Sequence, residues 1–305
     1  MRLVYFGSGE FGLPTLKRLV DEHDVALLVT QPDRPAGRHR LLRPTPACQF
    51  AQEHNIETIK PAGIRDPQVQ QRIRAAGADA LVVIAYGQKL PAALLDHAFA
   101  INLHGSLLPR YRGAAPINWA IINGENETGL SVIRITQRID AGDVLAQRAT
   151  PIDPMETAGE LECRLADLGS DLVLETLANF HSNQLHPIKQ DDRLACPAPK
   201  LSKSDATVHF DQPACAVQRR IHGLTPWPGC TVTLDGRQLR VARVELADEH
   251  LADAVPGELL PDRAIACAPG AVRLLEVQPP GGKVMSFTAF CHGHDLRLGS
   301  RVRSL

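Results

Sequence analysis

Asn102 and His104 stand two residues apart at the end of a short apolar run, INLH. Side chains two positions apart on a strand project from the same face of a sheet. An asparagine amide that can donate to a developing oxyanion therefore lies beside an imidazole that can carry a proton. Asp140 follows on the glycine-containing segment IDAGD (139–143). Together these residues are candidates for acyl transfer without a serine or cysteine nucleophile.

An Asn-x-His pair taken alone is more often a hydrogen-bonded turn or core pair than a catalytic one. The segment that follows it, SLLPRYRGAAPI (106–117), favours catalysis. It resembles the signature of the enzymes that transfer a formyl group from 10-formyltetrahydrofolate. In that family the Asn and His of N-x-H and the first Asp of D-x-G-D are catalytic. They correspond to Asn102, His104 and Asp140 here.

The same resemblance implies a site for the formyl donor, 10-formyltetrahydrofolate, and no metal. The folate is expected along residues 85–91, with its reactive end at Asn102, and the SLLP segment lines the same cleft in the relatives. Arg110 and Arg112 can be read equally as clamps for folate glutamate or phosphate and as structural residues that hold their loop. The expected folate-binding residues are Tyr86, Gly87, Gln88, Leu90, Ser106, Leu107, Leu108 and Pro109.

Residues 31–47 form a basic excursion that is rich in arginine and proline. Such a run is usually a solvated loop, although it can also grip a phosphate backbone. QPDRPAGR (31–38) resembles the inserted loop of the family members that act on methionyl-tRNA, which enters the acceptor arm. KLSK (200–203) and RRIHGLTPWPG (219–229) resemble segments of the same enzymes. The resemblance implies methionyl-initiator tRNA as partner, bound through Arg38, Arg40, Arg43, Lys200 and Lys203.

The expected reaction is formyl transfer to the α-amino group of methionyl-initiator tRNA, which supplies N-formylmethionyl-tRNA for translation initiation. A formyltransferase acting on an amino-sugar nucleotide or another small amine would use the same three residues. A folate-dependent hydrolase that releases formate would use them with water as nucleophile, and a non-catalytic RNA-binding role is a further alternative. The sequence indicates no obligate protein partner.

Gly7–Gly12 (GSGEFG) satisfies the GxGxxG pattern of dinucleotide-binding loops directly after the first apolar run. Asp33 follows shortly after the second run, roughly where an acidic residue would hold a ribose. However, prolines and arginines surround Asp33, and Glu10 would face a pyrophosphate with like charge. We therefore interpret the glycines as a tight strand-to-helix turn that needs small residues for packing.

The first half of the chain must place the motifs, and its pattern alternates apolar strands with helices. Residues 3–6, 25–30 and 80–86 are apolar runs typical of buried parallel strands. A long helix is predicted over 153–177, with a break near Gly169. This alternation predicts an α/β doubly wound, Rossmann-like fold with a mostly parallel sheet. In such sheets ligands bind beyond the carboxyl ends of the strands, where the motifs fall.

The pattern changes after residue 186. Residues 187–203 are proline-rich and resemble a linker, and short alternating runs separated by turns follow, including the hairpin signal Asp235-Gly236. These runs predict a small C-terminal OB-like β-barrel. We predict a catalytic domain over 1–186, a linker over 187–203, and a tRNA-binding barrel over 204–305.

The bulk composition is that of an ordinary soluble protein. The chain has 305 residues, 44% hydrophobic residues and a formal net charge of −1, so overall basicity gives no argument for nucleic acid. Seven scattered cysteines without a CxxC pair indicate reduced thiols, and CHGHD (291–295) is a weak metal pattern. No signal peptide and no apolar run of membrane length are evident, which predicts a cytoplasmic protein.

Overall fold

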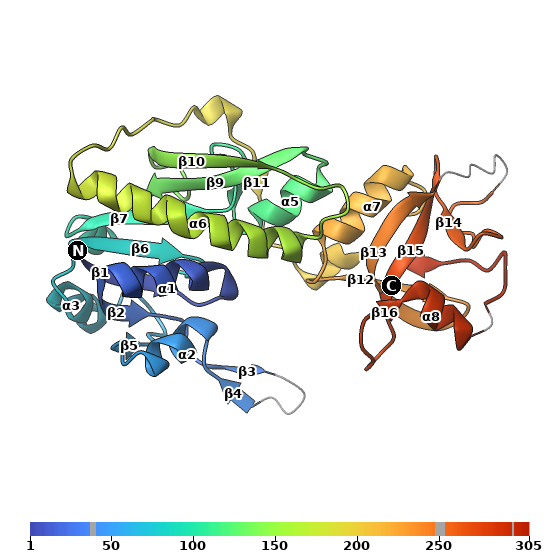
Figure 1. The fold of residues 1–305 in the computed structure, drawn as a ribbon, viewed down its shortest axis with the longest axis horizontal. Coiled ribbons are helices and arrows are strands. Elements are labelled where there is room, and N and C mark those ends of the chain that lie inside the picture. Colours follow the sequence, from blue (N-terminus) through green and yellow to red (C-terminus); the bar gives the residue numbers. More distant parts are fainter. Residues whose placement is uncertain (37–40, 248–253, 295, 305) are drawn as a thin grey trace. The chain divides into compact units, whose positions relative to one another are not determined.

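A computed structural model of the chain describes residues 1–36, 41–247, 254–294 and 296–304 (Figure 1). The contacts divide the chain into two compact units. The N-terminal unit comprises Met1–Gly113, Gly129–Thr150 and Glu162–Pro197, and the C-terminal unit comprises Ala114–Thr128, Pro151–Leu161 and Ala198–Leu305. Two segments from the middle of the chain thus belong with the C-terminal third.

A seven-stranded sheet forms the centre of the N-terminal unit. The strands along its middle and one edge pair in parallel, and β7 pairs antiparallel with β9. This confirms the Rossmann-like prediction. The strand order is β10 (Val144–Pro151), β9 (Glu127–Arg134), β7 (Phe99–His104), β6 (Ala80–Ile84), β1 (Arg2–Gly7), β2 (Asp24–Val29) and β5 (Thr58–Ile59).

Apolar strands with both faces covered build the core of this unit. All five residues of β6 are buried, as expected for a central parallel strand. Val4 and Phe6 of β1 pack in one cluster with Ile73 and Leu94, which come from helices on one face of the sheet. The described helices within residues 1–113 are α1 (Leu13–Glu22), α2 (Pro46–Glu53), α3 (Pro67–Ala75), α4 (Ala92–Leu95) and the short 3-10 helix η1 (Glu10–Gly12).

Helix α6 (Ala158–His181) is continuous, so the predicted break near Gly169 is wrong. A Cβ atom on Gly169 would lie 2.5 Å from Cδ2 of Leu103 in β7. The glycine therefore permits a close approach of the helix to the sheet. Its low helix propensity, on which the predicted break depended, is outweighed by this packing.

The GxGxxG segment has the packing role that the sequence favours. A Cβ on Gly12 would lie 2.1 Å from Oη of Tyr5, whose hydroxyl donates to Gly12 O at 2.8 Å. The carboxylate of Asp33 accepts a hydrogen bond of 2.6 Å from Nζ of Lys60. The buried side chain of Tyr5 thus packs against the glycine-rich segment. Asp33, the candidate ribose ligand, is already paired with the ammonium group of Lys60.

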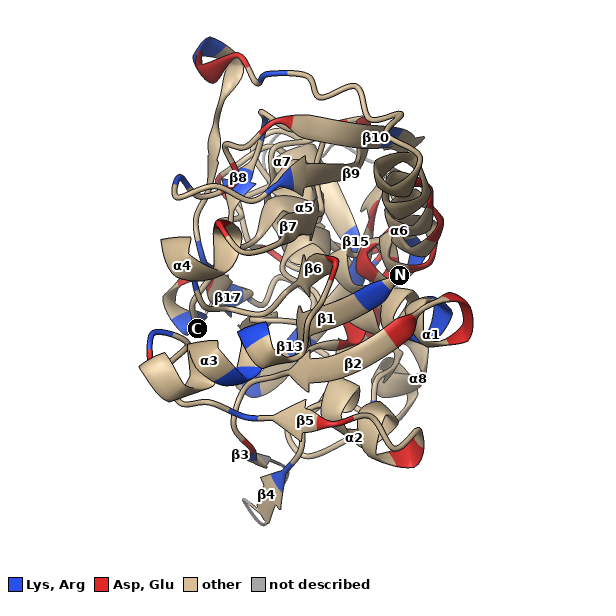
Figure 2. Ribbon diagram, turned by 90° about the vertical axis from the view of Figure 1, so that its left-hand side faces the viewer, with Lys and Arg blue, Asp and Glu red and all other residues tan. Residues whose placement is uncertain are grey.

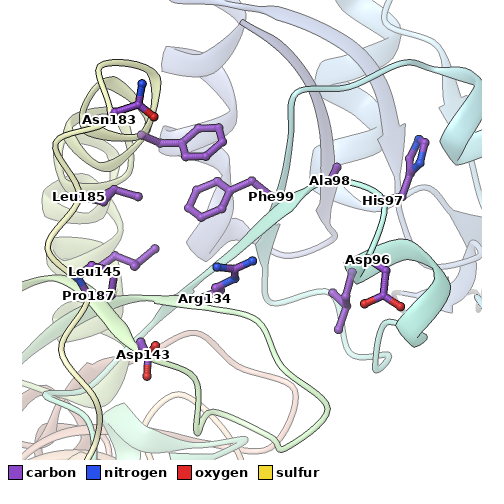
Figure 3. A pocket seen from close by; sticks show the side chains of 12 residues that line it. Asp96, His97, Ala98, Phe99, Arg134, Asp143, Leu145, Asn183, Leu185 and Pro187 are labelled. Carbon is purple, nitrogen blue, oxygen red and sulfur yellow. The ribbon is translucent and has the colours of Figure 1, made fainter.

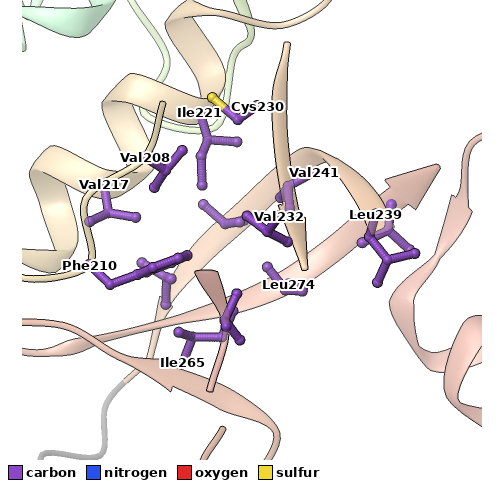
Figure 4. Packing of buried hydrophobic residues seen from close by; sticks show 14 of the residues in the cluster. Val208, Phe210, Val217, Ile221, Cys230, Val232, Leu239, Val241, Ile265 and Leu274 are labelled. Carbon is purple, nitrogen blue, oxygen red and sulfur yellow. The ribbon is translucent and has the colours of Figure 1, made fainter. Parts of the chain in front are cut away.

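The C-terminal unit contains an antiparallel, curled half-barrel, which confirms the class of the predicted β-barrel. Its sheet order is β14 (Ala264–Ala266), β15 (Ala271–Gln278), β13 (Arg237–Ala247), β12 (Cys230–Leu234) and β17 (Arg303–Ser304), with β16 (Met285–Ser286) paired to β15. Helices α5 (Pro116–Ile122), α7 (Ala214–Gly223) and α8 (Phe287–His292) and the 3-10 helix η3 (Lys203–Ala206) complete it. Figure 4 shows Ile221 of α7 and Val232 of β12 in the shared apolar core.

Helix α5 is a structural part of the C-terminal unit. Nδ2 of Asn118 donates to the carbonyl of Gly223 in α7 at 2.7 Å. A Cβ on Gly223 would lie 2.6 Å from Cγ1 of Ile122. The absence of a side chain at Gly223 therefore allows α5 and α7 to pack closely at this point. The buried Ala115 and the half-buried Trp119 and Ile122 pack against the core of this unit.

Cysteines and possible metal ligands show no cross-link or cluster within the described residues. All seven cysteines are free thiols. In the described ranges no three His, Cys, Asp or Glu side chains gather as a metal site, and Asp295 of CHGHD lies outside those ranges. None of the helices that the structure describes is both long and apolar enough to cross a membrane.

Candidate active site

Asn102 and His104 lie at the carboxyl end of β7, as the sequence predicts. In the strand register Asn102 stands between Val83 of β6 and Ile133 of β9, and His104 is opposite Ser131. The two residues therefore lie where the parallel part of the sheet meets its antiparallel edge. Asn102 is half-buried, and within the described residues nothing hydrogen-bonds its side-chain amide, which leaves that amide available to a substrate.

The imidazole of His104 is buried and held by a backbone group. Its Nε2 lies 2.8 Å from the carbonyl oxygen of Tyr111, which can only accept, so Nε2 carries the hydrogen. Its Nδ1 lies 3.7 Å from Oδ2 of Asp140. This separation exceeds a hydrogen bond, as is common for catalytic pairs that tighten when substrate binds. Nδ1 is the ring nitrogen that the backbone leaves free.

Asp140 lies in the loop between β9 and β10 with its backbone in the left-handed region, at φ 50°. Aspartate is one of the few residues other than glycine that tolerate this conformation. Its Oδ2 accepts a hydrogen bond of 2.9 Å from the backbone N–H of Gly113. A Cβ on Gly142 would lie 1.7 Å from the carbonyl oxygen of Arg134, so the loop packs directly on the end of β9. The three predicted catalytic residues are thus brought together.

Two polar residues that the sequence prediction missed hold the SLLP segment. Oγ of Ser131 in β9 donates to Ser106 O at 2.6 Å and accepts from Leu108 N at 3.0 Å. Nε2 of Gln147 in β10 donates to Leu108 O and to Oγ of Ser131, both at 2.8 Å. The signal in the sequence is weak: Ser131 is a polar residue between apolar neighbours in the segment LSVI of β9.

In the predicted folate-binding segment, residues 85–91, a ligand could reach backbone groups more easily than side chains. The Tyr86 ring lies in the core, edge-on to Phe6 at 5.5 Å, and burial raises the pKa of its hydroxyl to about 12. The Gln88 side chain accepts from Ile64 N at 2.9 Å. Ala85 and Gly87 are exposed and left-handed, at φ 49° and 84°. Among the predicted residues, those buried are Tyr86, Leu90, Ser106 and Leu108, and those accessible are Gly87, Gln88, Leu107 and Pro109.

The predicted tRNA-binding residues that the structure describes are all exposed. In the basic excursion, β3 (Arg34–Ala36) pairs antiparallel with β4 (Leu41–Arg43) (Figure 2). Arg43 is the last residue of β4. Leu41 and Leu42 beside it are 63% and 69% exposed. Lys200 precedes η3, and Lys203 begins it. Arg38 and Arg40 lie outside the described residues.

The Arg112 side chain is hydrogen-bonded to other parts of the protein. This supports the interpretation that Arg112 holds its own loop. Its side chain is only 14% exposed, and its Nη1 donates to Oδ1 of Asp192 at 2.9 Å. Its Nε and Nη2 both donate to Oε1 of Gln190, at 3.0 and 2.7 Å. Hydrogen bonds from Arg112 and Arg138 lower the pKa of the Asp192 carboxyl.

A pocket of about 510 Å³ lies at the amino-terminal end of β7, away from these groups (Figure 3). Phe99 and Phe180 stack beside it with centroids 3.9 Å apart, and Arg134 lies over the Phe99 ring at 6.0 Å. Because a strand rises about 3.3 Å per residue, Phe99 is roughly 17 Å from His104 along β7. None of the predicted site residues lines this pocket.

Comparison with protein families gives two matches along the chain. The formyl transferase family matches residues 1–177, and the formyl transferase C-terminal domain family matches residues 200–295. The chain is 41% identical to methionyl-tRNA formyltransferase of Geobacter sulfurreducens, over 99% of this chain and 96% of that protein. It is 40% identical to the enzyme of the same description from Methylococcus capsulatus, over 98% of this chain and 100% of that protein.

Solved structures share the fold at low sequence identity. HypX from Aquifex aeolicus in complex with tetrahydrofolic acid has a TM-score of 0.63 at 18% identity, over 95% of this chain. This chain spans 47% of HypX. WlaRD, a sugar 3N-formyl transferase solved in the presence of dTDP and 5-N-formyl-THF, has a TM-score of 0.64 at 14% identity, over 100% of this chain and 97% of its own.

Proposed function

The chain belongs to the formyl transferase family and within it to the methionyl-tRNA formyltransferases, and from this premise we propose how its own residues perform the reaction. The enzyme transfers a formyl group from 10-formyltetrahydrofolate to the α-amino group of methionyl-initiator tRNA. The observation that carries this function is full-length similarity to methionyl-tRNA formyltransferases in a chain whose Asn102, His104 and Asp140 meet at one end of β7.

The reaction begins when the neutral amine of the methionyl ester attacks the formyl carbon. A C–N bond forms, and the carbonyl oxygen takes up negative charge. The free amide N–H of Asn102 donates to this oxygen, because preorganised donors aimed at a developing oxyanion stabilise the transition state most. Asn102 is suited to this role because no group among the described residues competes for its amide.

Collapse of the adduct breaks the bond to N10 of the folate and requires one proton lost from the amine and one gained by N10. Nδ1 of His104 exchanges these protons, since Nε2 is held by Tyr111 O. Asp140 stabilises the protonated imidazole through its carboxylate, 3.7 Å away, or passes the proton through a water molecule. His104 acts as the acid and base, and Asp140 sets its charge and geometry.

The folate is bound through the ends of β6 and β7. Binding sites for small molecules commonly combine apolar walls with a few backbone donors and acceptors. The accessible backbone at Gly87 and the accessible Gln88, Leu107 and Pro109 fit this description. The buried members of the predicted set, Tyr86, Leu90, Ser106 and Leu108, contribute by shaping those segments.

The tRNA phosphates are bound by exposed cations of the basic excursion and of KLSK. Arg43, Lys200 and Lys203 are exposed and fit this role, and Arg38 and Arg40 belong to the same proposal from the sequence. Sugar N-formyltransferases share the fold at 14–18% identity, which gives no ground for preferring a sugar nucleotide. The relatives at about 40% identity favour tRNA.

The test is transfer of radiolabelled formyl from 10-formyltetrahydrofolate to methionyl-initiator tRNA. We expect wild type to transfer the label. Asn102→Ala and His104→Ala should each lower kcat by about 10²-fold or more, as deletion of oxyanion-hole donors does. A triple alanine variant of Arg38, Arg40 and Arg43 should mainly raise KM for tRNA. The logarithmic salt dependence of tRNA binding should become shallower, by roughly one for each phosphate that the variant no longer neutralises.

Lys17→Ala is the control for the basic variants, because Lys17 is an exposed cation on α1. It should leave KM for tRNA unchanged. Absence of transfer by wild type to tRNA, together with formylation of a sugar-nucleotide amine or release of formate, would overturn the substrate. Full activity of His104→Ala would overturn the mechanism.

A further inference from the structure

The first half of the predicted linker is packed on the N-terminal unit. Val144 N donates to Ile188 O and Ile188 N donates to Val144 O, each at 2.8 Å, which forms an antiparallel bridge to the start of β10. Val144 follows the loop of Asp140 directly in the chain. This bridge brings residues 188–196, here termed the strap, against the loop that carries the candidate catalytic carboxylate.

Gln190 of the strap is buried, and it uses every hydrogen-bonding group of its side chain. Its Nε2 donates to Asp140 O at 2.9 Å and to Gly142 O at 2.7 Å. Its Oε1 accepts both bonds from the Arg112 guanidinium. Carbonyls only accept and guanidinium only donates, so this is the single amide orientation that satisfies all four bonds. Gln190 thus connects the Asp140 loop to the segment after SLLP.

Asp192 extends this connection on the surface. Its Oδ1 accepts from Nη1 of Arg112 and its Oδ2 from Nη2 of Arg138, both at 2.9 Å. Arg138 belongs to the same loop as Asp140. The strap therefore contacts the loop on both sides of Asp140, at Arg138 and at Gly142. The left-handed backbone of Asp140 persists only where its surroundings hold it.

Cys196 at the end of the strap contacts the backbone of Tyr111, the residue whose carbonyl holds His104. Its Sγ accepts from Tyr111 N at 3.2 Å, and its carbonyl accepts from Arg112 N at 2.9 Å. Tyr111 O in turn holds Nε2 of His104. Gly113 N, two residues further on, holds the Asp140 carboxylate. One segment thus fixes the backbone on which both members of the pair depend.

We propose that the strap is a positioning element of the active site and that Gln190 is its main residue. Gln190 holds the Asp140 loop so that the carboxylate faces Nδ1 of His104, and Arg112 serves this contact instead of binding a ligand anion. The proposal rests on the proposed function, because its readout is formyl transfer. Gln190 touches no reacting atom and acts through Asp140.

The test combines kinetics with a double-mutant cycle. Gln190→Leu should lower kcat about 10- to 100-fold, because displacement of a catalytic group by about 1 Å can cost 10²-fold. KM for both substrates and equilibrium binding of 5-formyltetrahydrofolate should stay within about twofold. In an Asp140→Ala background, measured by single turnover, Gln190→Leu should change the rate less than about twofold, because its effect passes through the missing carboxylate.

Gln190→Glu separates positioning from general support of the fold. The carboxylate keeps the partner of Arg112 but presents oxygens to two carbonyls that need donors, so kcat should fall as with leucine. Arg193→Ala is the matched control: Arg193 is exposed, lies in the same strap and bonds Asp191. It should be as active as wild type. Circular dichroism shows whether each variant folds. If Gln190→Leu does not fold, Gln190→Glu takes its place in the double-mutant cycle.

The outcomes separate the two proposals. If wild type transfers no formyl group to tRNA, the proposed function fails. If wild type is active and the Gln190 variants match Arg193→Ala, the positioning role fails. If their losses remain in full on Asp140→Ala, Gln190 does not act through Asp140, and the inference is wrong. A rise of KM for the formyl donor in Arg112→Ala, with kcat unchanged, would show a ligand clamp.

Discussion

Backbone groups position the candidate catalytic side chains at the scale of single residues. The imidazole of His104 is held by a carbonyl, and the carboxylate of Asp140 is held by an amide N–H. Tyr111, which supplies that carbonyl, is left-handed at φ 59°, as Asp140 is at φ 50°. Such conformations cost about 1–3 kcal/mol outside glycine. The fold therefore gives up some stability to place the His104 imidazole and the Asp140 carboxylate so that they face each other.

Asp140→Asn tests the charge of this carboxylate separately from its shape. The amide oxygen can still accept from Gly113 N, so the loop should keep its conformation. The negative charge that faces Nδ1 of His104 is lost, so kcat should fall by about 100-fold or more, with KM changed less than about threefold. Steady-state kinetics with both substrates measures this. An unchanged kcat would reduce Asp140 to a structural residue.

Candidate catalytic residues could be named from the sequence, but the contacts that hold them in place could not. Asn102, His104 and Asp140 belong to short motifs whose residue types carry chemistry. Tyr111 O and Gly113 N are backbone groups that any residue type supplies, so no pattern marks them. Gln190 hydrogen-bonds a loop 50 positions away in sequence, which a single sequence does not reveal.

At the scale of elements, glycines bring helices and loops close to the strands that carry the site. Gly169 lets α6 approach Leu103, the residue between Asn102 and His104 on β7. Gly142 lets the Asp140 loop lie on the end of β9. Continuous apolar runs predicted the sheet correctly, because buried strands repeat one simple pattern. The break in α6 was predicted wrongly, because helix propensity does not include packing partners.

Gly142→Ala should disturb both stability and activity. The new methyl group would meet Arg134 O far inside contact distance, and overpacking of this kind costs about 1–3 kcal/mol. The loop should shift, and kcat should fall with it. Gly63→Ala is the matched control, since nothing lies within 4 Å of its Cβ position. Chemical denaturation and kinetics on both variants measure the effect, and equal stability of the two would contradict it.

His222 of α7 gives the C-terminal unit a pH-dependent stability. The ring is fully buried; its Nε2 accepts from Val244 N and its Nδ1 donates to Pro154 O. Burial lowers its pKa from the ordinary value of 6.5, although the hydrogen bond with Pro154 O and, to a smaller extent, the charge of Glu160 oppose this. The unfolded chain therefore takes up a proton that the folded chain does not, so the stabilising contribution is complete above pH 6.5 and decreases as pH falls below it.

Thermal unfolding from about pH 7.5 to about pH 5 checks this. The slope attributable to His222 should not exceed about 1.4 kcal/mol per pH unit. His222→Gln should be less stable at neutral pH, because a buried hydrogen bond is weakened. It should also lose less stability on acidification than wild type. Parallel pH curves for the two proteins would exclude His222 as the titrating group.

At the scale of the whole molecule, the order of the chain does not follow the division into units. Segments 114–128 and 151–161 belong with the C-terminal third. The sequence predicted the two kinds of fold because strand patterns and turn spacing differ between the halves. It gave no sign that α5 packs on α7, since an apolar helix face does not name its partner.

A fragment of residues 1–186 should therefore fold poorly on its own. It keeps α5 but lacks α7 and the core that covers Ala115, Trp119 and Ile122. We expect it to bind a hydrophobic dye and to aggregate in size-exclusion chromatography, whereas the full chain does neither. Replacing Trp119 and Ile122 by glutamine in the fragment should reduce both effects. A monomeric fragment as heat-stable as the full chain would contradict this packing.

The packing of α5 on α7 also has consequences for the synthesis of the protein and for rearrangement of its gene. During synthesis α5 leaves the ribosome about 90 residues before α7, which at typical rates is a wait of roughly 5–20 s. Its apolar face is without its partner for that time, when a chaperone could bind it. A gene split or recombined at residues 187–203 would inherit α5 with one half and its packing surface with the other.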